Sequence, residues 1–559
     1  MLNFANKLRF VLDKSDIALL PYLILFSVFM SAIETLGFAA VMPFVSIILD
    51  PEDDWLSLIN SFIGAFAEPP SKERLIIILS ILLMSFYLFR ATCLFYFFKT
   101  LAWYSESRFE RLTTKLFRIY LKMSLQDFSR GNSGQKLKDL SSETARLTTL
   151  VSSLLLMLSE ICVFVFLYGF LIWLNFKITL ILSGIFFVVA TLIYVFVVKK
   201  IRSAGVERAN KQEFFFKNVS SDFGNYKYIK INSKQFFSLS RFSSIAKDWA
   251  CANMVSATLG HVPRITFETL CFAIVIFMVV LAGASQQDSI AQLLPLISVY
   301  VLALYRVLPS FNRIFAALNE ISFQLKALDI IFETLSLAKD EKLKDDDGIK
   351  FKEVKFQNLT VGYDGRPVIE NINFSIKKGD WVCISGETGS GKSTLLDVIM
   401  GLLKPIDGKV IVDGMSMDIS NSRGWRSQFG LVPQNVYLFD GSISENIAYG
   451  EHPDPAKINY LLDVVGLSEI VKERGGLNSR IGEGGINFSG GQKQRFAIAR
   501  ALYKSPTILA FDEATNALDK GTEKIIVDRI KKLFKDTTVI FITHNEDLKS
   551  MATKIIHLN

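Results

Sequence analysis

The 559-residue sequence predicts a membrane domain of six α-helices followed by a soluble α/β domain. Two patterns predict this fold class. Six apolar segments, each long enough to cross about 30 Å of hydrocarbon, lie at 17–48, 74–101, 147–174, 177–199, 262–283 and 289–313. Further on, short β-rich runs such as "WVCISG" and "TILAFD" alternate with helical segments, which is typical of a largely parallel sheet. We therefore expect a membrane domain at 1–325, a linker at 326–348 and the soluble domain at 349–559.

The loops between the apolar segments predict which side of the membrane they face. Residues 99–138 and 199–247 are long, helical in pattern and rich in Lys and Arg, whereas 50–73 is acidic. Basic loops stay in the cytoplasm, so we expect both termini and the soluble domain there. Short polar breaks near 128–134 and 222–228 are interpreted as coupling elements that touch the soluble domain, with ordinary solvated turns as the alternative.

Composition argues against several other classes of protein. The net charge of +8 is spread along the ends of the apolar segments, without an aromatic–basic RNA motif, so we expect no nucleic-acid partner. The five cysteines lie in apolar runs or in a predicted strand, which predicts no disulfide framework. The N-terminal stretch "MLNFANKLRFVLDKSD" has no signal-peptide cleavage site, and we interpret it as an amphipathic helix on the inner membrane surface.

The stretch "GETGSGKS" (386–393) is a phosphate-binding loop (P-loop) in its required context, between a predicted strand and a helical run. Its glycines let the backbone close on phosphates, while N–H groups and the helix N-terminus face the negative charge. We expect Lys392 to reach the β- and γ-phosphates and Ser393 to bind Mg²⁺. The nucleotide-binding residues expected here are Gly386, Glu387, Thr388, Gly389, Ser390, Gly391, Lys392, Ser393 and Thr394.

A second apolar strand, "ILAFDE", ends in two adjacent carboxylates. Asp512 suits the ligand shell of Mg²⁺ and the nucleotide site, and Glu513 suits polarising the attacking water, because phosphoryl transfer depends on positioning and electrostatics. Such a pair is common on protein surfaces but rare at the tip of a buried strand. The two motifs together predict hydrolysis of a nucleoside triphosphate.

A glycine-rich turn at 487–495, "NFSGGQKQR", precedes another helix. It resembles the signature motif of ABC ATPases, with phenylalanine where leucine is usual, and with the P-loop it makes the whole chain similar to an exporter-type ABC half-transporter. The resemblance implies ATP and Mg²⁺ as cofactors and a head-to-tail homodimer, in which one subunit's signature completes the partner's P-loop site. The signature residues are Phe488, Ser489, Gly490, Gly491 and Gln492.

The same resemblance implies roles for five further residues. Tyr363, in "TVGYDG", would stack on adenine, and Gln434, in "LVPQNVYLF", would link Mg²⁺ to the membrane domain. Glu483, in "RIGEGG", falls in a loop between domains, Asp519, in "NALD", is the D-loop residue, and His544, in "FITHN", is the switch histidine.

Two positions depart from the family pattern: Asn516 stands where serine is usual, and Asn545 where arginine often follows the histidine. Neither removes a catalytic group, so both sites of a homodimer are expected to hydrolyse ATP. The resemblance thus implies Glu513, Gln434 and His544 as catalytic residues and Ser393, Gln434 and Asp512 as Mg²⁺ ligands.

Four arginines lie within the predicted spans at roughly the depth of the inner leaflet. At 1.5 Å per residue, Arg90, Arg264, Arg306 and Arg313 lie about 22, 27, 24 and 35 Å from the outer ends of their spans. One interpretation is snorkelling to the cytoplasmic interface, with Glu268 as a local partner of Arg264. We favour the other, a shared site for an anionic headgroup, because guanidinium groups form bidentate bonds to phosphates.

The acidic loop contains a candidate amphipathic helix at about 52–67. A helix of this kind lies in the membrane interface, or it packs on its own protein. In the functional interpretation it holds an exposed lipid tail on the outer side. The residues of its apolar face are Trp55, Leu58, Ile59, Phe62, Ile63 and Phe66.

This insertion, together with "SAIETLGFAAVMPF" in the first span and "LALYRVLPSFNRI" in the sixth, resembles the PglK-type flippases of bacterial N-glycosylation. The resemblance implies movement of undecaprenyl-pyrophosphate-linked oligosaccharide from the cytoplasmic to the periplasmic leaflet of the inner membrane. An exporter of lipid A, a drug or a peptide stays open, although the arginines argue against neutral drugs. An ATP-gated channel or regulatory subunit is the alternative of another class, and the intact Glu513 and signature argue against it.

Overall fold

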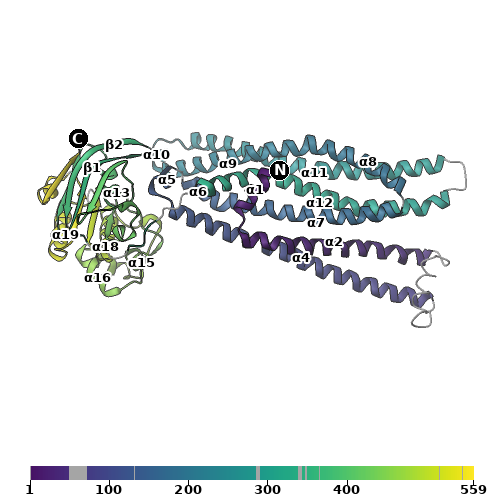
Figure 1. The fold of residues 1–559 in the computed structure, drawn as a ribbon, viewed down its shortest axis with the longest axis horizontal. Helices are drawn as coiled ribbons and strands as arrows, with labels where there is room; N and C mark the ends of the chain where they lie inside the picture. The colour runs from purple at the N-terminus through teal and green to yellow at the C-terminus, as the bar shows by residue number, and fades with distance from the viewer. Residues whose placement is uncertain are drawn as a thin grey trace. The chain divides into compact units, whose positions relative to one another are not determined.

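The computed structural model of the chain describes residues 2–49, 72–130, 133–174, 176–284, 290–337, 343–346, 349, 351–363, 365–514, 517–543 and 545–558. These residues form two compact units (Figure 1). The first unit, Met1–Leu121 with Gly131–Ala338, is helical. The second unit joins Lys339–Asn559 to the short stretch Lys122–Arg130, which contains α5 (Leu125–Arg130).

Several helices of the first unit are longer than a bilayer requires. The 51 residues of α4 correspond to about 76 Å, so basic helical extensions continue beyond any membrane, as predicted. The elements are α1 (Leu2–Val11), α2 (Lys14–Leu49), α4 (Lys72–Lys122), α6 (Ser133–Lys138), the π-helix η1 (Asp139–Glu143), α7 (Thr144–Leu174), α8 (Phe176–Ile193), the π-helix η2 (Tyr194–Val198), α9 (Lys199–Gly224), α10 (Tyr226–Ile231), α11 (Gln235–Ala284) and α12 (Ile290–Leu337).

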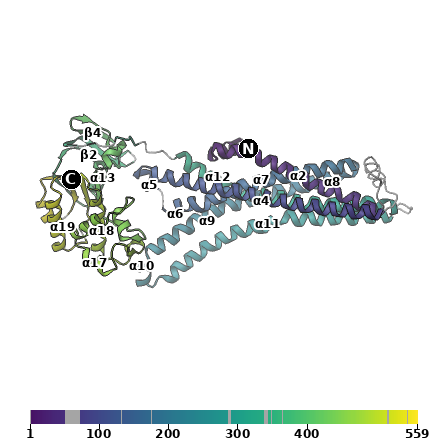
Figure 2. The same cartoon turned by 90° about the horizontal axis from the view of Figure 1, so that it is seen from below.

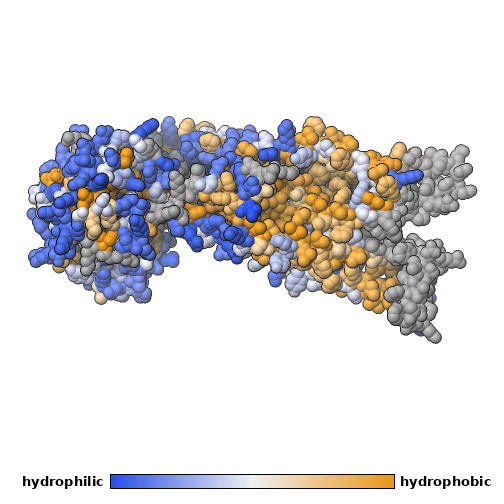
Figure 3. Space-filling view, in the orientation of Figure 1, coloured by the Kyte–Doolittle hydropathy of each residue, from blue (hydrophilic) through white to orange (hydrophobic). Residues whose placement is uncertain are grey.

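Four helical stretches among the described residues are long and apolar enough to span a membrane, namely Lys14–Gly37, Glu73–Lys122, Gly134–Gly169 and Thr179–Gly224. The fifth predicted segment falls within α11, and the sixth corresponds to the first half of α12. Residues 285–289, between these helices, and several side chains within them lie outside the described part. Apolar side chains gather on the surface of this unit (Figure 3), as expected of helices that face lipid.

Close helix packing holds the first unit together. The helix α7 packs against α2 and α12, and α11 packs against α9 and α12, so these helices run side by side (Figure 2). At Gly205 of α9, an added Cβ would lie 2.4 Å from the Phe323 carbonyl oxygen of α12. Glycine therefore permits an approach that no other residue allows there.

The N-terminal helix differs from the prediction of a helix on the membrane surface. Val11 of α1 is buried in a cluster with Leu328 and Ile331 of α12. The Lys7 Nζ also lies 2.6 Å from an Asp329 carboxylate oxygen. The apolar side of α1 therefore packs on protein, and its partners in α12 lie more than 300 residues further along the chain.

The second unit has two main sheets. A five-stranded sheet with all strands parallel has the order β11-β3-β10-β9-β6, and an antiparallel sheet has the order β2-β1-β4-β5, while β7 pairs with β8. The strands are β1 (Glu353–Tyr363), β2 (Arg366–Lys377), β3 (Trp381–Gly386), β4 (Asp407–Val412), β5 (Met415–Ser416), β6 (Phe429–Val432), β7 (Gly441–Ser442), β8 (Arg480–Ile481), β9 (Ile508–Asp512), β10 (Thr538–Ile542) and β11 (Lys554–Leu558).

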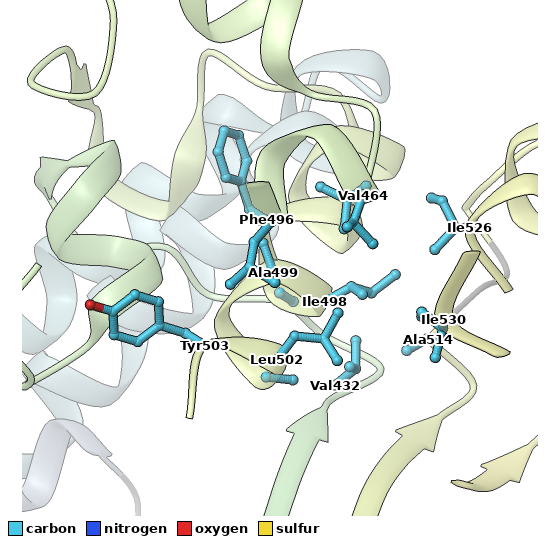
Figure 4. Close-up of a cluster of buried hydrophobic side chains, with 14 of the residues drawn as sticks. Val432, Val464, Phe496, Ile498, Ala499, Leu502, Tyr503, Ala514, Ile526 and Ile530 are labelled. Carbon is cyan, nitrogen blue, oxygen red and sulfur yellow. The ribbon is translucent and has the colours of Figure 1, made fainter. Parts of the chain in front are cut away.

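Helices cover the parallel sheet and bury its strands, whose runs are almost continuously apolar. In one cluster, side chains of α18 and α19 meet Val432 of β6 and Ala514 (Figure 4). The helices and 3₁₀ turns are α13 (Lys392–Ile399), η3 (Ile419–Asn421), α14 (Arg423–Arg426), α15 (Ile443–Ala448), α16 (Pro455–Val464), α17 (Ser468–Glu473), η4 (Glu483–Gly485), α18 (Gly490–Tyr503), α19 (Lys520–Leu533) and α20 (Glu546–Ser550).

Candidate functional site

The parallel sheet brings the predicted ATP-site segments to one edge. The P-loop follows β3, Asp512 ends β9 with Glu513 directly after it, and Gln434 follows β6. Since β3, β10, β9 and β6 are consecutive neighbours with parallel pairing, their carboxyl ends meet at the same edge, where α/β sheets bind ligands. His544, two residues after the end of β10 in the sequence, lies outside the described residues.

The P-loop adopts the backbone that its glycines allow. Gly389 has φ +90° and Gly391 has φ +91°, in the left-handed region that other residues rarely enter. Gly391 is the N-cap of α13, so the first N–H groups of this helix open toward the loop. This arrangement is suited to an anion.

The P-loop lysine is held by its own loop. The buried Lys392 donates from Nζ to the carbonyl oxygens of Gly386 at 3.0 Å and Glu387 at 2.7 Å. A buried ammonium without an anionic partner depends on such bonds. A phosphate placed in this loop would offer Lys392 a stronger, charge-assisted partner.

The residues expected to hold Mg²⁺ fit that ion. Ser393 donates from Oγ to Asp512 Oδ1 at 2.9 Å, which places a hydroxyl and a carboxylate together, and Mg²⁺ prefers such oxygen ligands. Burial raises the pKa of Asp512, while the Ser393 hydrogen bond lowers it and the charge of Glu513 raises it further. A divalent cation would remove the cost of burying this carboxylate.

The predicted catalytic glutamate is held in a strained position. Gln434 donates from Nε2 to Glu513 Oε2 at 2.8 Å. Glu513 has φ +47°, and its N–H donates to the Ile542 carbonyl oxygen at 3.2 Å. A non-glycine residue in this region costs about 1–3 kcal/mol, and such residues cluster at active sites.

A half-buried carboxylate that the sequence did not single out interacts with Asp512 of this site. Burial and the charge of Asp512 together raise the pKa of Asp397, on α13, to about 6. The hydroxyls of Tyr363 and Thr394 are 3.4 Å apart, and Tyr363 is 41% exposed. That exposure leaves the ring accessible for stacking.

The signature segment forms the start of α18. Ser489 is the N-cap of this helix. Its Oγ accepts the backbone N–H of Gln492, and the Gln492 side chain accepts the backbone N–H of Ser489, so the two residues form a capping box. Phe488, the unusual residue, is buried against Phe496 with ring centroids 5.0 Å apart and lies beneath the Arg474 guanidinium at 4.3 Å. Its role in this unit is therefore packing, which a leucine side chain can also serve.

Asp519 is the N-cap of α19 and accepts the Thr522 N–H at 2.9 Å. These backbone and side-chain bonds lower the pKa of Asp519. Several other predicted site residues lie outside the described residues or have side chains that do: Glu483, Arg306 and the apolar face of the expected external helix, Trp55, Leu58, Ile59, Phe62, Ile63 and Phe66.

Three of the predicted headgroup arginines form ion pairs. Arg264 lies 3.7 Å from Glu268, as the spacing suggested, and both side chains are largely exposed. Arg90 lies 3.2 Å from Glu34, and Arg313 lies 2.7 Å from Glu160. These two carboxylates are buried, and sequence reasoning missed them because both partners come from other helices.

A cavity of about 350 Å³ lies between α2, α4, α7 and α12 in the first unit. Glu34, Glu160 and Arg313 line it, together with hydroxyls of Ser31 and Ser159 and apolar side chains of α4. Its wall is mostly apolar and carries a few charged and hydroxyl groups, and it lies among helices that the sequence places in the membrane.

Comparisons with known proteins agree with this architecture. The family model "ABC transporter transmembrane region" matches residues 17–305, and the model "ABC transporter" matches residues 369–516. The ATP-dependent lipid A-core flippase of Burkholderia orbicola is 28% identical over 413 residues, 70% of this chain and 67% of the relative. That of Paraburkholderia xenovorans is 27% identical over 465 residues, 80% of this chain and 76% of the relative.

Among solved structures, a bacterial Atm1-family ABC exporter with ATP bound matches with a TM-score of 0.75 at 22% identity, covering 97% of this chain and 94% of that one. It shows the same fold. The ATPase domain implies binding of ATP with Mg²⁺. The chain belongs to the ABC transporters, as an exporter-type half-transporter that couples ATP hydrolysis to transport.

Proposed function

We propose that the protein is a homodimeric flippase that moves a polyprenyl-pyrophosphate-linked oligosaccharide from the cytoplasmic to the periplasmic leaflet of a bacterial inner membrane, for protein N-glycosylation. One observation carries the proposal. Two arginines from different helices, Arg90 and Arg313, are held at carboxylates that line one cavity inside the membrane unit. Ionisable groups at such a depth are costly and mark substrate paths.

The chemistry of the cargo follows from the guanidinium group. It presents planar donors that match phosphate oxygens in pairs, and a pyrophosphate offers two phosphates to arginines from two helices. The resemblance of the first and sixth spans to PglK-type flippases supports the oligosaccharide cargo. In this proposal Arg264 and Arg306 extend the same anion site, and the apolar face at about 52–67 holds the lipid tail.

A lipid A-like cargo is the second candidate. It is favoured by the names of two relatives, both lipid A-core flippases at 27–28% identity. Because the lipid A headgroup is also phosphorylated, the same arginines suit it. The two candidates differ in the sugar and the lipid tail, and the experiment below compares them directly.

The nucleotide site is proposed to act through positioning. Lys392 and the P-loop N–H groups bind the phosphates, Tyr363 stacks on adenine, and Ser393, Asp512 and Gln434 hold Mg²⁺, which supplies charge neutralisation when bound. Glu513 orients the attacking water, and its bond to Gln434 holds the carboxylate at the edge of the sheet. His544 completes the catalytic group in this proposal.

The proposed dimer follows from surfaces that one chain leaves uncovered. The break at 222–228 is present as the end of α9 and the start of α10, and Phe223, Tyr228 and Ile231 there are 75%, 66% and 82% exposed. An apolar patch on a basic, cytoplasmic extension needs a partner. We propose that this partner is the ATPase domain of the second copy. In the same dimer, the signature of one subunit completes the P-loop site of the other. Both termini lie in the cytoplasm in this proposal.

The test is ATP-dependent movement of a fluorescent polyprenyl-pyrophosphate oligosaccharide in proteoliposomes, with fluorescent lipid A in a parallel arm. We expect Glu513→Gln to lower both ATPase and transport by on the order of a hundredfold or more. Arg90→Ala and Arg313→Ala should abolish transport and keep ATPase, whereas Arg423→Ala, at an exposed pair with Asp345 in the soluble unit, serves as the matched control. Movement of lipid A alone would replace the oligosaccharide lipid by lipid A as the proposed cargo. ATPase activity without movement of either lipid would overturn the proposal that the protein is a flippase.

A further inference from the structure

Asn545 follows the predicted switch histidine at a position where arginine is frequent in the family, and its side chain makes two hydrogen bonds. Its Nδ2 donates to Glu523 Oε2 of α19 at 2.7 Å, and its Oδ1 accepts the Asp547 N–H at 3.0 Å as the N-cap of α20. An amide supplies a donor and an acceptor at once, whereas arginine supplies donors alone. Arginine here could therefore bond to Glu523 but could not cap α20.

Glu523 is the buried member of this pair. It is 6% exposed, and its backbone N–H donates to the Asp519 carbonyl oxygen at 2.9 Å near the start of α19. A carboxylate at such a position needs hydrogen-bond donors in place of the water that it has lost, and bonds to a charged acceptor are short and strong. The pair is thus a specific link between the segment after β10 and the N-terminal part of α19.

The backbone of Asn545 is held as well. Its N–H donates to Thr543 Oγ1 at 3.0 Å, and Thr543, directly after β10, is 2% exposed. In the sequence, His544 stands between these two residues. Because a peptide bond joins neighbouring residues at a fixed length, a displacement of Asn545 is passed directly to the histidine.

The N-terminal part of α19 is also tied to the helix that carries the signature. Asp519 is the N-cap of α19, and Ala517, two residues before it, donates its N–H to Gln494 Oε1 of α18 at 3.2 Å. A Cβ added at Gly491 would lie 2.9 Å from the Ala517 carbonyl oxygen, so the signature segment and the D-loop are in close contact. The start of α19 therefore contacts the signature helix through the D-loop and the segment after β10 through Asn545.

We propose that Asn545 and Glu523 are positioning residues for ATP hydrolysis: their hydrogen bond fixes the segment that carries His544 relative to the D-loop and the signature helix. This inference rests on the role of His544 in the nucleotide site proposed above and adds the residues that hold its segment. Neither residue belongs to the P-loop or to the Mg²⁺ ligands. The pair should therefore affect the turnover of bound ATP and not its binding.

The bond can be removed and rebuilt with substitutions that keep the shape of the side chains. Asn545→Asp keeps an oxygen for the α20 N–H, but it replaces the donor to Glu523 by a second carboxylate oxygen, so that two carboxylates repel each other. Adding Glu523→Gln rebuilds the bond with opposite polarity, because the new amide can donate to the new carboxylate. Glu523→Gln alone keeps an acceptor for the Asn545 amide.

Steady-state ATPase of the full-length protein in nanodiscs, measured as kcat and as KM for ATP, tests the pair, with thermal midpoints recorded on the same samples. The variants are Asn545→Asp, Glu523→Gln and their combination. The matched controls are Asn358→Asp, at an exposed position of β1, and Glu546→Gln, whose side chain is 82% exposed. His544→Ala tests the role of the histidine on which the inference rests.

We expect Asn545→Asp to lower kcat by on the order of tenfold to a hundredfold, because small misplacements of a positioned group are costly to turnover. Its KM for ATP should stay close to that of the parent. Glu523→Gln alone and the combined variant should have kcat values close to the parent, and so should both controls. Recovery in the combined variant would assign the loss to the hydrogen bond itself.

If His544→Ala is inactive, a parental kcat in Asn545→Asp would overturn the inference and leave the proposed nucleotide site intact. The same conclusion would follow from a combined variant no more active than Asn545→Asp alone. A loss in Glu523→Gln as large as that in Asn545→Asp would also overturn it, since the carboxylate charge and not the bond would then be required. Parental activity in His544→Ala would overturn the proposed role of the histidine and the inference together.

Discussion

At the scale of single residues, the soluble unit buries charge where a nucleotide would compensate it. Lys392 donates to carbonyl oxygens of its own loop, Asp512 accepts a hydrogen bond from Ser393, and the charge of Asp512 acts on Asp397 of α13. Each arrangement is costly without an ionic partner. Stability without nucleotide should therefore depend on these groups.

Asp397 gives a pH-dependent prediction. Its pKa in the fold is raised to about 6, so ionisation is harder in the folded than in the unfolded chain. The resulting loss of stability is absent below the ordinary pKa near 3.8, grows as the pH rises to about 6, and is constant above that. Asp397→Asn should thus raise the thermal midpoint at pH 7.5 but leave it nearly unchanged at pH 4.

We expect a gain of about 1 kcal/mol at pH 7.5, after discounting for the part of the side chain that water still reaches. Differential scanning fluorimetry of the nucleotide-free, full-length protein measures it. Asp528→Asn, at an exposed position on α19, is the control. An equal shift at both pH values would show that burial of the Asp397 charge is not the cause.

At the scale of elements, the approach of α9 to α12 depends on one glycine. A methyl group at Gly205 would meet the Phe323 carbonyl oxygen at 2.4 Å, whereas one at Gly224, on the same helix, would meet nothing within 4 Å. We expect Gly205→Ala to destabilise the first unit by about 1–3 kcal/mol, since backbone cannot move aside cheaply.

Gly224→Ala should be neutral or stabilising by up to about 1 kcal/mol, because alanine favours the helix. The thermal midpoints of the two variants in the same detergent provide the comparison. Similar midpoints would mean that α9 and α12 do not pack this closely in the folded protein.

At the scale of the whole molecule, the head-to-tail dimer predicts complementation between two inactive chains. Lys392→Ala removes the P-loop lysine, and Ser489→Arg places a bulky charge at the signature. If each site combines the P-loop of one subunit with the signature of the other, a mixed dimer holds one intact site. Co-expressed chains should then recover roughly a quarter of the parent ATPase rate if chains mix at random and sites act independently.

Differently tagged chains, purified through both tags, allow the ATPase of the mixed dimer to be measured directly. Each variant expressed alone is the control and should be inactive. Mixed dimers that are as inactive as either parent variant would refute sites shared between subunits.

By itself, the sequence determined the two-domain architecture and the segments that form the nucleotide site. Both signals are local: an apolar run of membrane length needs no partner to be recognised, and a strand–loop–helix with spaced glycines has one backbone solution. The parallel strands then bring their ends to one edge, so Ser393 meets Asp512 and Gln434 meets Glu513.

Only the tertiary structure decided which charges in the membrane unit are neutralised. The pairing of Arg264 with Glu268 follows from four-residue spacing, but Arg90–Glu34 and Arg313–Glu160 depend on how separate helices rotate and pack. The same applies to α1, whose apolar side is covered by α12. Periodicity shows which face of a helix is polar or apolar, whereas the partner of that face is set by contacts between distant parts of the chain.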